Sequence, residues 1–320
     1  TLWLPPVNGP ARPWTREDSL PADPHDFTFA LLSDRTGLAR AGVFERAVET
    51  LNWLYPDFVV QIGDGIEGYT TDESELAAQW TEFDKIVDGL ERPLFRVVGN
   101  HDVSNPVMRE DWLRRHGLLH YHFRYADTLF LVIDTCDPPQ SLEEVAGDLT
   151  PERLAELHAR VATDPDGVRE EFEALGDWES TQPAAISEEQ IAYFERVLAE
   201  HSDARWTFLC MHMPAWQGDG HPALERLYAA LGERPFTAFA GHIHNYQRRI
   251  IRGRDHIRLG PTGGAWVRTG DIGNFDHVTL VRMTPEGPKI ANLVLDGLLG
   301  VDGGTYPPSS TPPSTPKGRP

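Results

Sequence analysis

Short apolar runs alternate with helical patterns in the first third of the chain. The apolar runs Phe27–Leu32, Phe58–Ile62 and 94–98 predict buried strands. Between them, Val43–Leu54 and 73–90 carry apolar residues at helical spacing. This alternation predicts an α/β fold with a largely parallel sheet covered by helices. Right-handed crossovers then place the carboxyl ends of all three strands at one edge of the sheet, where ligands of such sheets bind.

The later part of the chain predicts more strands. The segments 118–125 and Thr128–Ile133 have the pattern of a hairpin, and Trp206–Met211 and Phe236–Ala240 have that of buried strands. We expect an antiparallel second sheet from four further segments, which are 247–252, 256–259, 277–283 and 290–295.

The same pattern divides the chain into regions. Residues 1–26 are rich in proline and polar residues and predict an N-terminal arm. Residues 27–300 predict one domain, interrupted at about 137–185 by an acidic segment of helical tendency that we interpret as an insertion over the edge of the site. Residues 301–320 have the Pro/Ser/Thr-rich composition of a tail that cannot build a core.

The net charge and the cysteine content limit which partners the protein can bind and in which cellular compartment we expect it. The chain has 320 residues and a net charge of −20, which argues against binding to a nucleic-acid duplex. It has no run of about 18 apolar residues, so no membrane span is predicted. Cys136 and Cys210 lie in apolar runs and predict buried free thiols, which favours the cytoplasm. The chain begins at Thr1, so secretion after removal of a signal stays open, and the oligomeric state is not predicted.

Five polar blocks follow apolar runs and carry the candidate chemistry. In chain order they are Ser33-Asp34-Arg35-Thr36, Gly63-Asp64-Gly65-Ile66-Glu67, Gly99-Asn100-His101-Asp102, Met211-His212-Met213-Pro214 and Gly241-His242-Ile243-His244. Together they offer carboxylates, an amide oxygen and imidazoles, which are the donors that two divalent metal ions need.

Two blocks carry residues that suit a pair of metal ions, although Asp64 taken alone could also be a turn residue. The carboxylate of Asp64 could bridge two ions, and the preceding Gly63 lets the backbone pass close to the site. His242 and His244 are two residues apart just after a predicted strand. In an extended segment such side chains point the same way, so we expect them to serve neighbouring metals.

From about residue 27 to residue 295 the blocks resemble those of the calcineurin-like metallophosphoesterases. This resemblance implies an α/β fold that is a four-layer αββα sandwich, with mixed sheets, helices on both outer faces and a site at the carboxyl ends of strands. It implies two divalent ions with Asp64 as the bridge. The implied ligands of the first ion are Asp34, Asp64 and His244, and those of the second are Asp64, Asn100, His212 and His242.

The resemblance also implies roles for the residues around the metals. His101 matches the histidine that contacts the substrate and acts as general acid, and Asp102 matches its orienting carboxylate. The first block departs from the family pattern, because Thr36 stands where a histidine is usual. Purple acid phosphatases lack that histidine too and use a tyrosine three residues after the bridging aspartate. Here that place holds Glu67, which we predict as the missing ligand, favouring Mn or Fe over Zn.

Other charged and imidazole side chains are weaker candidates. Arg35 could bind a phosphate oxygen of the substrate, or it could form an ion pair away from the site. His116, His120 and His122 predict residues of a sheet edge or pocket wall, and His221 could line the pocket.

The function that follows is hydrolysis of a small-molecule phosphoester, with a metal-bound hydroxide as the implied nucleophile. A phosphomonoester is favoured as substrate. The alternatives are a phosphodiesterase acting on a nucleotide or a lipid headgroup, a non-catalytic scaffold of the same fold, and other dinuclear-metal chemistry in a biosynthetic pathway.

Overall fold

The computed structural model describes residues 2–20, 26–140, 150–161, 163–174, 184–265 and 273–297, and its strands form two mixed sheets. In spatial order the seven-stranded sheet holds β1 (Leu2–Trp3), β5 (Tyr121–Tyr125), β6 (Thr128–Ile133), β7 (Trp206–Met211), β8 (Phe236–Ala240), β10 (Arg254–Arg258) and β9 (Gln247–Ile251). The five-stranded sheet holds β12 (Gly287–Val294), β11 (His277–Thr284), β2 (Phe27–Leu32), β3 (Phe58–Ile62) and β4 (Leu94–Val97).

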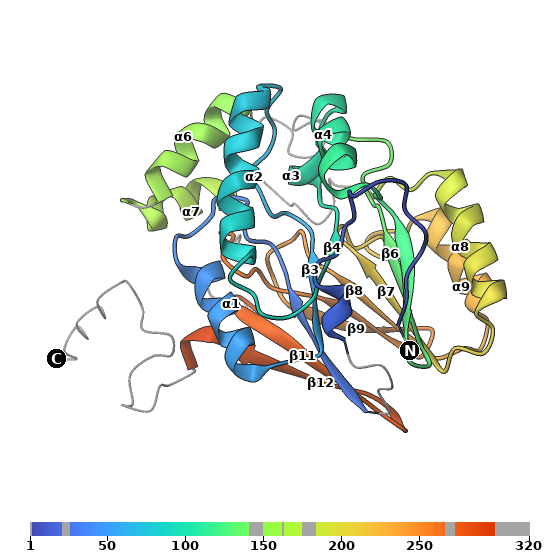
Figure 1. Cartoon of the computed structure of the whole chain (residues 1–320). Helices are drawn as coiled ribbons and strands as arrows, with labels where there is room; N and C mark the ends of the chain where they lie inside the picture. Colours follow the sequence, from blue (N-terminus) through green and yellow to red (C-terminus); the bar gives the residue numbers. More distant parts are fainter. Residues whose placement is uncertain are drawn as a thin grey trace.

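Helices cover the outer faces of the two sheets (Figure 1). On the side of the five-stranded sheet lie α1 (Val43–Leu54) and α2 (Glu73–Val87), and on the side of the seven-stranded sheet lie α8 (Glu188–Glu200) and α9 (Pro222–Leu231). The remaining helices are α3 (Asn100–Val103), α4 (Pro106–His116), α6 (Pro151–Val161) and α7 (Pro165–Ala174). The layers follow the order helix, sheet, sheet, helix, which confirms the expected sandwich.

An aromatic core fills the space between the sheets. Along β2, Phe29 belongs to this inner core, whereas the next residue, Ala30, belongs to the core under the helices. The ring of Phe29 stacks on that of Phe58 with centroids 5.3 Å apart, and Phe58 meets Phe130 of the other sheet edge-on at 5.5 Å. Burial of each such side chain contributes about 1.5–3 kcal/mol, so this layer fixes how the sheets face each other.

Parallel strands in both sheets end at the site. The strands β2, β3 and β4 are parallel, and so are β6, β7 and β8. The polar blocks that follow these strands lie in contact with one another, since the Arg35 N–H donates to the Asp64 carbonyl and the Gly241 N–H to the His212 carbonyl. The predicted convergence of strand ends is therefore confirmed for the first three strands and extends to the second sheet.

The predicted antiparallel second sheet is wrong. The strands β9 and β10 extend the seven-stranded sheet, where β10 runs parallel to β8. The strands β11 and β12 join the other sheet, where β11 pairs antiparallel with β2. Each pair is a local hairpin, as predicted, but the sheet edge that a hairpin joins depends on distant strands. The predicted hairpin of β5 and β6 is confirmed.

The apolar periodicity misses two helices. Before α4, the Asn105 side chain accepts a hydrogen bond from the Met108 N–H at 3.0 Å, and Pro106 occupies the first turn. Before α9, His221 caps the helix in a similar way and Pro222 follows. The capping residue and proline are the signals that could have found both helices.

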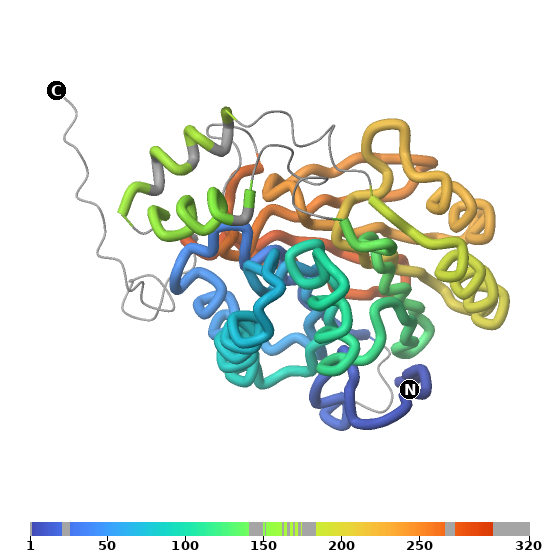
Figure 2. The backbone as a smooth tube through the Cα atoms, turned by 90° about the horizontal axis from the view of Figure 1, so that it is seen from above, coloured from blue at the N-terminus to red at the C-terminus, as the bar shows by residue number. Residues whose placement is uncertain are grey.

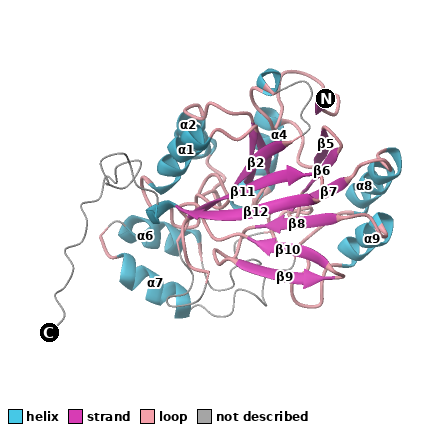
Figure 3. Cartoon of the chain, turned by 90° about the horizontal axis from the view of Figure 1, so that it is seen from below, coloured by secondary structure: helices cyan, strands magenta, loops and turns pink. Residues whose placement is uncertain are grey.

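The described parts of the N-terminal arm and of the insertion pack onto the domain. Strand β1 of the predicted arm pairs with β5, and Trp14 is buried. Helices α6 and α7 lie inside the predicted insertion, on the opposite side of the molecule from α8 and α9 (Figures 2 and 3). Cys136 and Cys210 are buried free thiols, as predicted. The predicted tail lies outside the described residues. Within the described part of the chain, no helix is both long and apolar enough to cross a membrane.

Candidate metal centre

Two overlapping groups of side chains form the centre. One group is Asp64, His212 and His242, and the other is Asp34, Asp64 and His244. The ligand atoms within each group lie within 4.8 Å of one another. Asp64 belongs to both groups, so its two carboxylate oxygens can serve two ions. The structure thus brings together five of the predicted ligands.

The shortest contacts run between imidazoles and carboxylates. The Nε2 atom of His212 is 3.0 Å from Oδ2 of Asp64, and Nε2 of His244 is 3.4 Å from Oδ1 of Asp34. Asp34 and Asp64 are buried, with at most 1% of their surface exposed. Two carboxylates at this depth require cationic partners, because burial of unpaired charge is costly.

Main-chain carbonyls orient two of the imidazoles. The Nδ1–H of His212 donates to the Ile62 carbonyl at 2.7 Å, and the Nδ1–H of His244 donates to the Ala265 carbonyl. Each ring therefore turns Nε2 toward the carboxylates. Metal-ligating histidines have this arrangement, in which the second ring nitrogen donates to a carbonyl or carboxylate.

Asn100 is the sixth predicted ligand, and its amide is oriented by Tyr69. The amide nitrogen donates to the Tyr69 hydroxyl at 2.7 Å, so Oδ1 faces inward and lies 2.9 Å from Nε2 of His212. Burial raises the pKa of Tyr69 further above its ordinary value, which keeps the hydroxyl neutral. Tyr69 was not predicted from the sequence.

The residues fit two divalent ions. Among the described residues, Nε2 of His242 is buried without a hydrogen-bond partner, and its Nδ1 is 3.3 Å from Nε2 of His212. A buried nitrogen without a partner is rare in native proteins and calls for an explanation. A bound cation would pair these nitrogens with the carboxylates of Asp34 and Asp64.

The carboxylates and imidazoles of the centre shift one another's pKa values. Burial opposes protonation of His212, but the carboxylates of Asp64 and Asp34 outweigh it and raise the pKa of His212 to about 9. Burial and the neighbouring His212 lower the pKa of His242 to about 3. Burial alone would raise the pKa of Asp34, but the hydrogen bond from His244, the charges of His244 and His212 and the hydrogen bond from Ser33 together lower it. Without a metal, protons on the imidazoles compensate the carboxylates, and a metal would displace them.

Three candidate ligands have a strained backbone. The φ angles are 56° at Asp64, 73° at His242 and 55° at His244. Residues other than glycine rarely adopt this left-handed region, and such strain clusters at functional sites. The two histidines reach different groups, as predicted, but not because the segment is extended.

His101 lies at the exposed edge of the centre. Its Nδ1–H donates to the main-chain carbonyl of Glu67 at 2.7 Å, and its Nε2 is 3.9 Å from Oδ2 of Asp64. The side chain is 13% exposed, so a substrate can reach Nε2. The partner that orients this imidazole is the Glu67 carbonyl.

Asp102 does not have the predicted orienting contact. Its carboxylate accepts the N–H groups of Asp64 at 3.0 Å, Gly65 at 2.9 Å and Gly99 at 2.9 Å. In the first turn of α3 its carboxylate caps the Gly99 N–H, and the other two N–H groups come from the loop after β3. Burial and the charge of Asp64 raise the pKa of Asp102 to about 7. Asp102 therefore fixes the loop that carries Asp64.

Glu67 belongs to neither ligand group. Its carboxylate accepts the N–H of Ala39 at 2.8 Å and that of Leu38 at 3.3 Å, and it pairs with Nδ1 of His158 at 3.1 Å. Burial would raise the pKa of Glu67, but the contact with His158 outweighs it and lowers the pKa. The structure thus does not place Glu67 in the predicted position of a metal ligand.

The weaker candidates have other roles. Arg35 donates to the Gly65 carbonyl and pairs with Glu82 of α2, which agrees with the ion-pair alternative. His116 packs against α2, and His120 and His122 contact Tyr193 of α8. His221 caps α9.

Main-chain acceptors were not predictable. The carbonyls of Ile62, Ala265 and Glu67 orient the three imidazoles, and every residue type has a carbonyl. Tyr69 lies two residues after Glu67 and could have been found only from its contact with Asn100.

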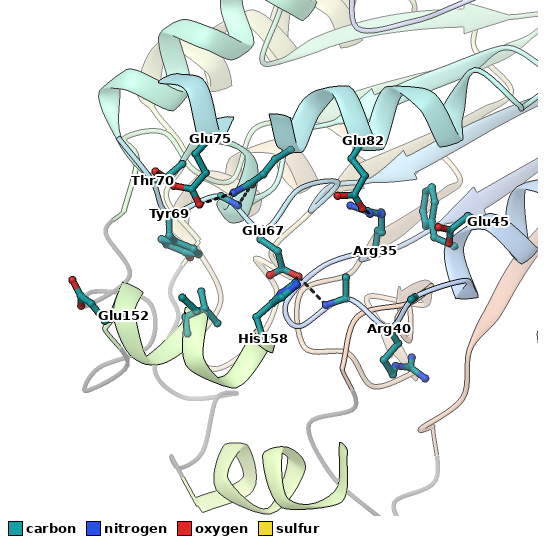
Figure 4. Close-up of a pocket in the computed structure, with 17 residues that line it drawn as sticks. Arg35, Arg40, Glu45, Glu67, Tyr69, Thr70, Glu75, Glu82, Glu152 and His158 are labelled. Carbon is teal, nitrogen blue, oxygen red and sulfur yellow. Dashed lines mark hydrogen bonds and ion pairs between the residues drawn. The ribbon is translucent and has the colours of Figure 1, made fainter. Parts of the chain in front are cut away.

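A cavity of about 610 Å³ lies beside the centre (Figure 4). Glu67 and Tyr69 form part of its wall, and His158 and Leu154 of α6 also line it. Five glutamates line the cavity, including Glu152 at its outer side, so the lining is acidic.

Comparisons with known proteins identify the fold and the family. The sequence model described as calcineurin-like phosphoesterase matches residues 22–246. A dimetal phosphatase from Danio rerio is 14% identical, with a TM-score of 0.51, over 84% of this chain and 98% of that one. The protein PhoD is 13% identical, with a TM-score of 0.55, over 85% of this chain and 69% of that one.

A purple acid phosphatase from yellow lupin seeds is 14% identical, with a TM-score of 0.52, over 80% of this chain and 49% of that one. A comparison with curated protein sequences gives no match. At these identities the solved structures share the fold with this chain.

Proposed function

The chain belongs to the calcineurin-like phosphoesterase family and is a phosphoric ester hydrolase, and we propose that its substrate is a small phosphomonoester. The observation that supports this proposal is the pair of ligand groups that share Asp64, with Nε2 of His101 at their exposed edge. Metal-dependent hydrolysis of a phosphoester needs both parts, a site for two ions and a proton donor.

Six side chains would hold the ions. The first ion would be held by Asp34, Asp64 and His244, and the second by Asp64, Asn100, His212 and His242. When bound, two divalent ions supply a nucleophilic water at neutral pH and offset the charge of the phosphoryl oxygens. Carboxylate, amide and imidazole donors suit Mn, Fe or Zn. The preference for Mn or Fe rested on Glu67, and it loses that basis because Glu67 is in neither ligand group and contacts Ala39 and His158 instead.

His101 would donate the proton to the leaving oxygen. Its Nδ1–H is fixed by the Glu67 carbonyl, so the second proton of the imidazolium is on Nε2, the nitrogen that faces the centre. General acid catalysis of this kind contributes roughly 10²–10⁴-fold to the rate. Arg35 is engaged with Glu82, so we assign it no substrate contact.

The choice of a monoester is supported by the names of two similar structures, a dimetal phosphatase and a purple acid phosphatase. A phosphodiesterase is the second candidate, because the same centre could hold a diester. A non-catalytic scaffold of the same fold is the third candidate, and it differs from the other two in lacking hydrolysis, whether or not it binds metal.

The test compares two esters of the same leaving group. Purified chain is analysed for metal content, supplemented with Mn²⁺, and assayed with p-nitrophenyl phosphate and with bis(p-nitrophenyl) phosphate. We expect a higher kcat/KM for the monoester. A higher kcat/KM for the diester would replace the monoester proposal, and bound metal without hydrolysis of either ester would favour the scaffold.

A further inference from the structure

A residue of the insertion contacts the loop that follows Asp64. His158 of α6 places Nδ1 3.1 Å from Oε1 of Glu67. The His158 side chain is 45% exposed and that of Glu67 is 18% exposed. The two side chains point toward each other in the lining of the cavity (Figure 4).

Glu67 connects this contact to the centre. Its carboxylate holds the N–H groups of Leu38 and Ala39, in the loop that begins with the first polar block. Its main-chain carbonyl accepts the Nδ1–H of His101 at 2.7 Å. One residue therefore touches the insertion with its side chain and the candidate general acid with its backbone.

Apolar contacts of α6 reinforce the same arrangement. Leu154 and Leu157 form a small buried cluster with Leu38, and Tyr69 and Ala265 pack against it. This cluster is separate from the two main cores of the domain.

The cluster contacts Tyr69 and Ala265, and these two residues orient side chains of the candidate metal centre. Tyr69 accepts the amide N–H of Asn100, and the Ala265 carbonyl accepts the Nδ1–H of His244. Helix α6 therefore covers segments whose positions decide where donor atoms of the centre point.

The backbone around Glu67 leaves little room for displacement. Gly68 has a φ of 64°, and a Cβ atom there would lie 1.7 Å from the carbonyl oxygen of His101. The Tyr69 ring meets the His101 ring edge-on with centroids 4.8 Å apart. A shift of residues 67–69 would therefore move His101 with them.

We propose that helix α6 positions the general acid, with His158 holding Glu67 and the Glu67 carbonyl holding the imidazole of His101. His158 and Glu67 are then positioning residues, because they act through His101. The inference rests on the proposed function, and it replaces the sequence-based prediction that Glu67 is a metal ligand.

The experiment compares substitutions in one helix on two monoesters. His158→Ala removes the contact with Glu67. Arg160→Ala is the matched control, because Arg160 of α6 pairs with Glu171 and Asp164 inside the insertion. The substrates are p-nitrophenyl phosphate, whose leaving group needs little protonation, and glycerol 2-phosphate, whose alkoxide needs a proton.

A misplaced general acid should affect the poor leaving group most. For His158→Ala we expect kcat on glycerol 2-phosphate to fall roughly ten-fold, which is less than the full effect of losing a general acid. The fall in kcat on p-nitrophenyl phosphate should be clearly smaller. The Arg160→Ala control should keep both rates. His158→Gln retains an N–H donor and should recover much of the lost rate.

Two further readouts do not depend on activity. In Glu67→Gln, the metal content should equal that of the unchanged protein. The second readout is ¹⁵N NMR of the protein labelled at histidine, in which the variant His101→Gln assigns the Nδ1–H signal of His101. In the unchanged protein this proton should be protected from exchange with solvent. In His158→Ala it should lose that protection.

Each contrary result has its own meaning. Equal falls on both esters, unchanged rates in His158→Ala, or loss of metal in Glu67→Gln would overturn the positioning role. If the unchanged protein hydrolyses neither ester, the proposed function fails, and protection of the His101 signal alone decides whether α6 positions the imidazole.

Discussion

Three imidazoles of the centre share one arrangement, in which Nδ1–H donates to a main-chain carbonyl and Nε2 faces the carboxylates. The pairs are His212 with Ile62, His244 with Ala265, and His101 with Glu67. The first two rings are buried, whereas the His101 side chain is 13% exposed. The same orientation therefore suits two rings for metal ligation and one ring for proton donation.

This difference predicts separate effects of two substitutions. His101→Asn should lower kcat by roughly 10²–10⁴-fold because the proton donor is lost, while metal content stays unchanged. Asp64→Asn is the contrasting variant, since it removes the shared ligand and should lower both metal content and rate. Elemental analysis and steady-state kinetics on the same preparations measure both quantities. Metal loss in His101→Asn would contradict the assignment of its imidazole to the substrate.

At the scale of elements, α4 shows how a helix with weak periodicity is held in place. Its Trp112 ring lies 5.7 Å from that of Trp80 on α2, and its His116 ring lies 4.9 Å from the same indole. Burial and the charges of Arg96 and Arg115 hold the pKa of His116 well below its ordinary value. His116 therefore packs as a neutral aromatic side chain.

A neutral buried histidine makes the helix sensitive to acid. Below a pH of about 6.5 the unfolded chain takes up a proton at His116 that the folded chain does not, so the free energy of unfolding falls as pH decreases. Below that pH, His116 should lower the free energy of unfolding by about 1.4 kcal/mol for each pH unit. Urea unfolding at pH 7.5 and pH 5.5 measures it.

The variant His116→Leu keeps an apolar side chain and cannot be protonated. It should lose less stability between the two pH values than the unchanged chain does. Equal losses in both proteins would show that His116 is protonated in the folded state as well.

At the scale of the whole molecule, the centre joins the two sheets. Asp34 and Asp64 follow strands of the five-stranded sheet, and His212 and His242 follow strands of the seven-stranded sheet. The aromatic core holds the sheets together behind the site. Bound ions would link their ends at the site itself.

This geometry predicts that metal stabilises the whole fold. At a Mn²⁺ concentration of about 100 times Kd, linkage gives about 2.7 kcal/mol, which for a domain of this size raises Tm by on the order of 5 °C. Thermal unfolding of chelator-treated protein with and without Mn²⁺ measures the shift. Asp64→Asn should show little or none of it. An unchanged Tm on addition of Mn²⁺ to the original protein would argue against a centre that spans both sheets.

The sequence predicted the elements that have a local signature. Alternation and apolar runs located β2 and β3, and helical spacing located α1. No local pattern shows which sheet β9 and β10 join, because β10 pairs with β8 and that pairing depends on packing between distant segments. Helix α4 was not predicted, because its apolar periodicity is weak. The capping residue Asn105 and the following Pro106 are the features of the sequence that mark its start.

The sequence by itself determined the family, the sandwich and the order of the blocks that carry the candidate metal ligands, because residue type and position after a strand are local properties. Only the tertiary structure decided which atoms face the centre. It turned the carboxylate of Glu67 toward His158 and that of Asp102 toward backbone N–H groups. These choices depend on main-chain carbonyls and on contacts between distant segments, which leave no pattern in the order of side chains.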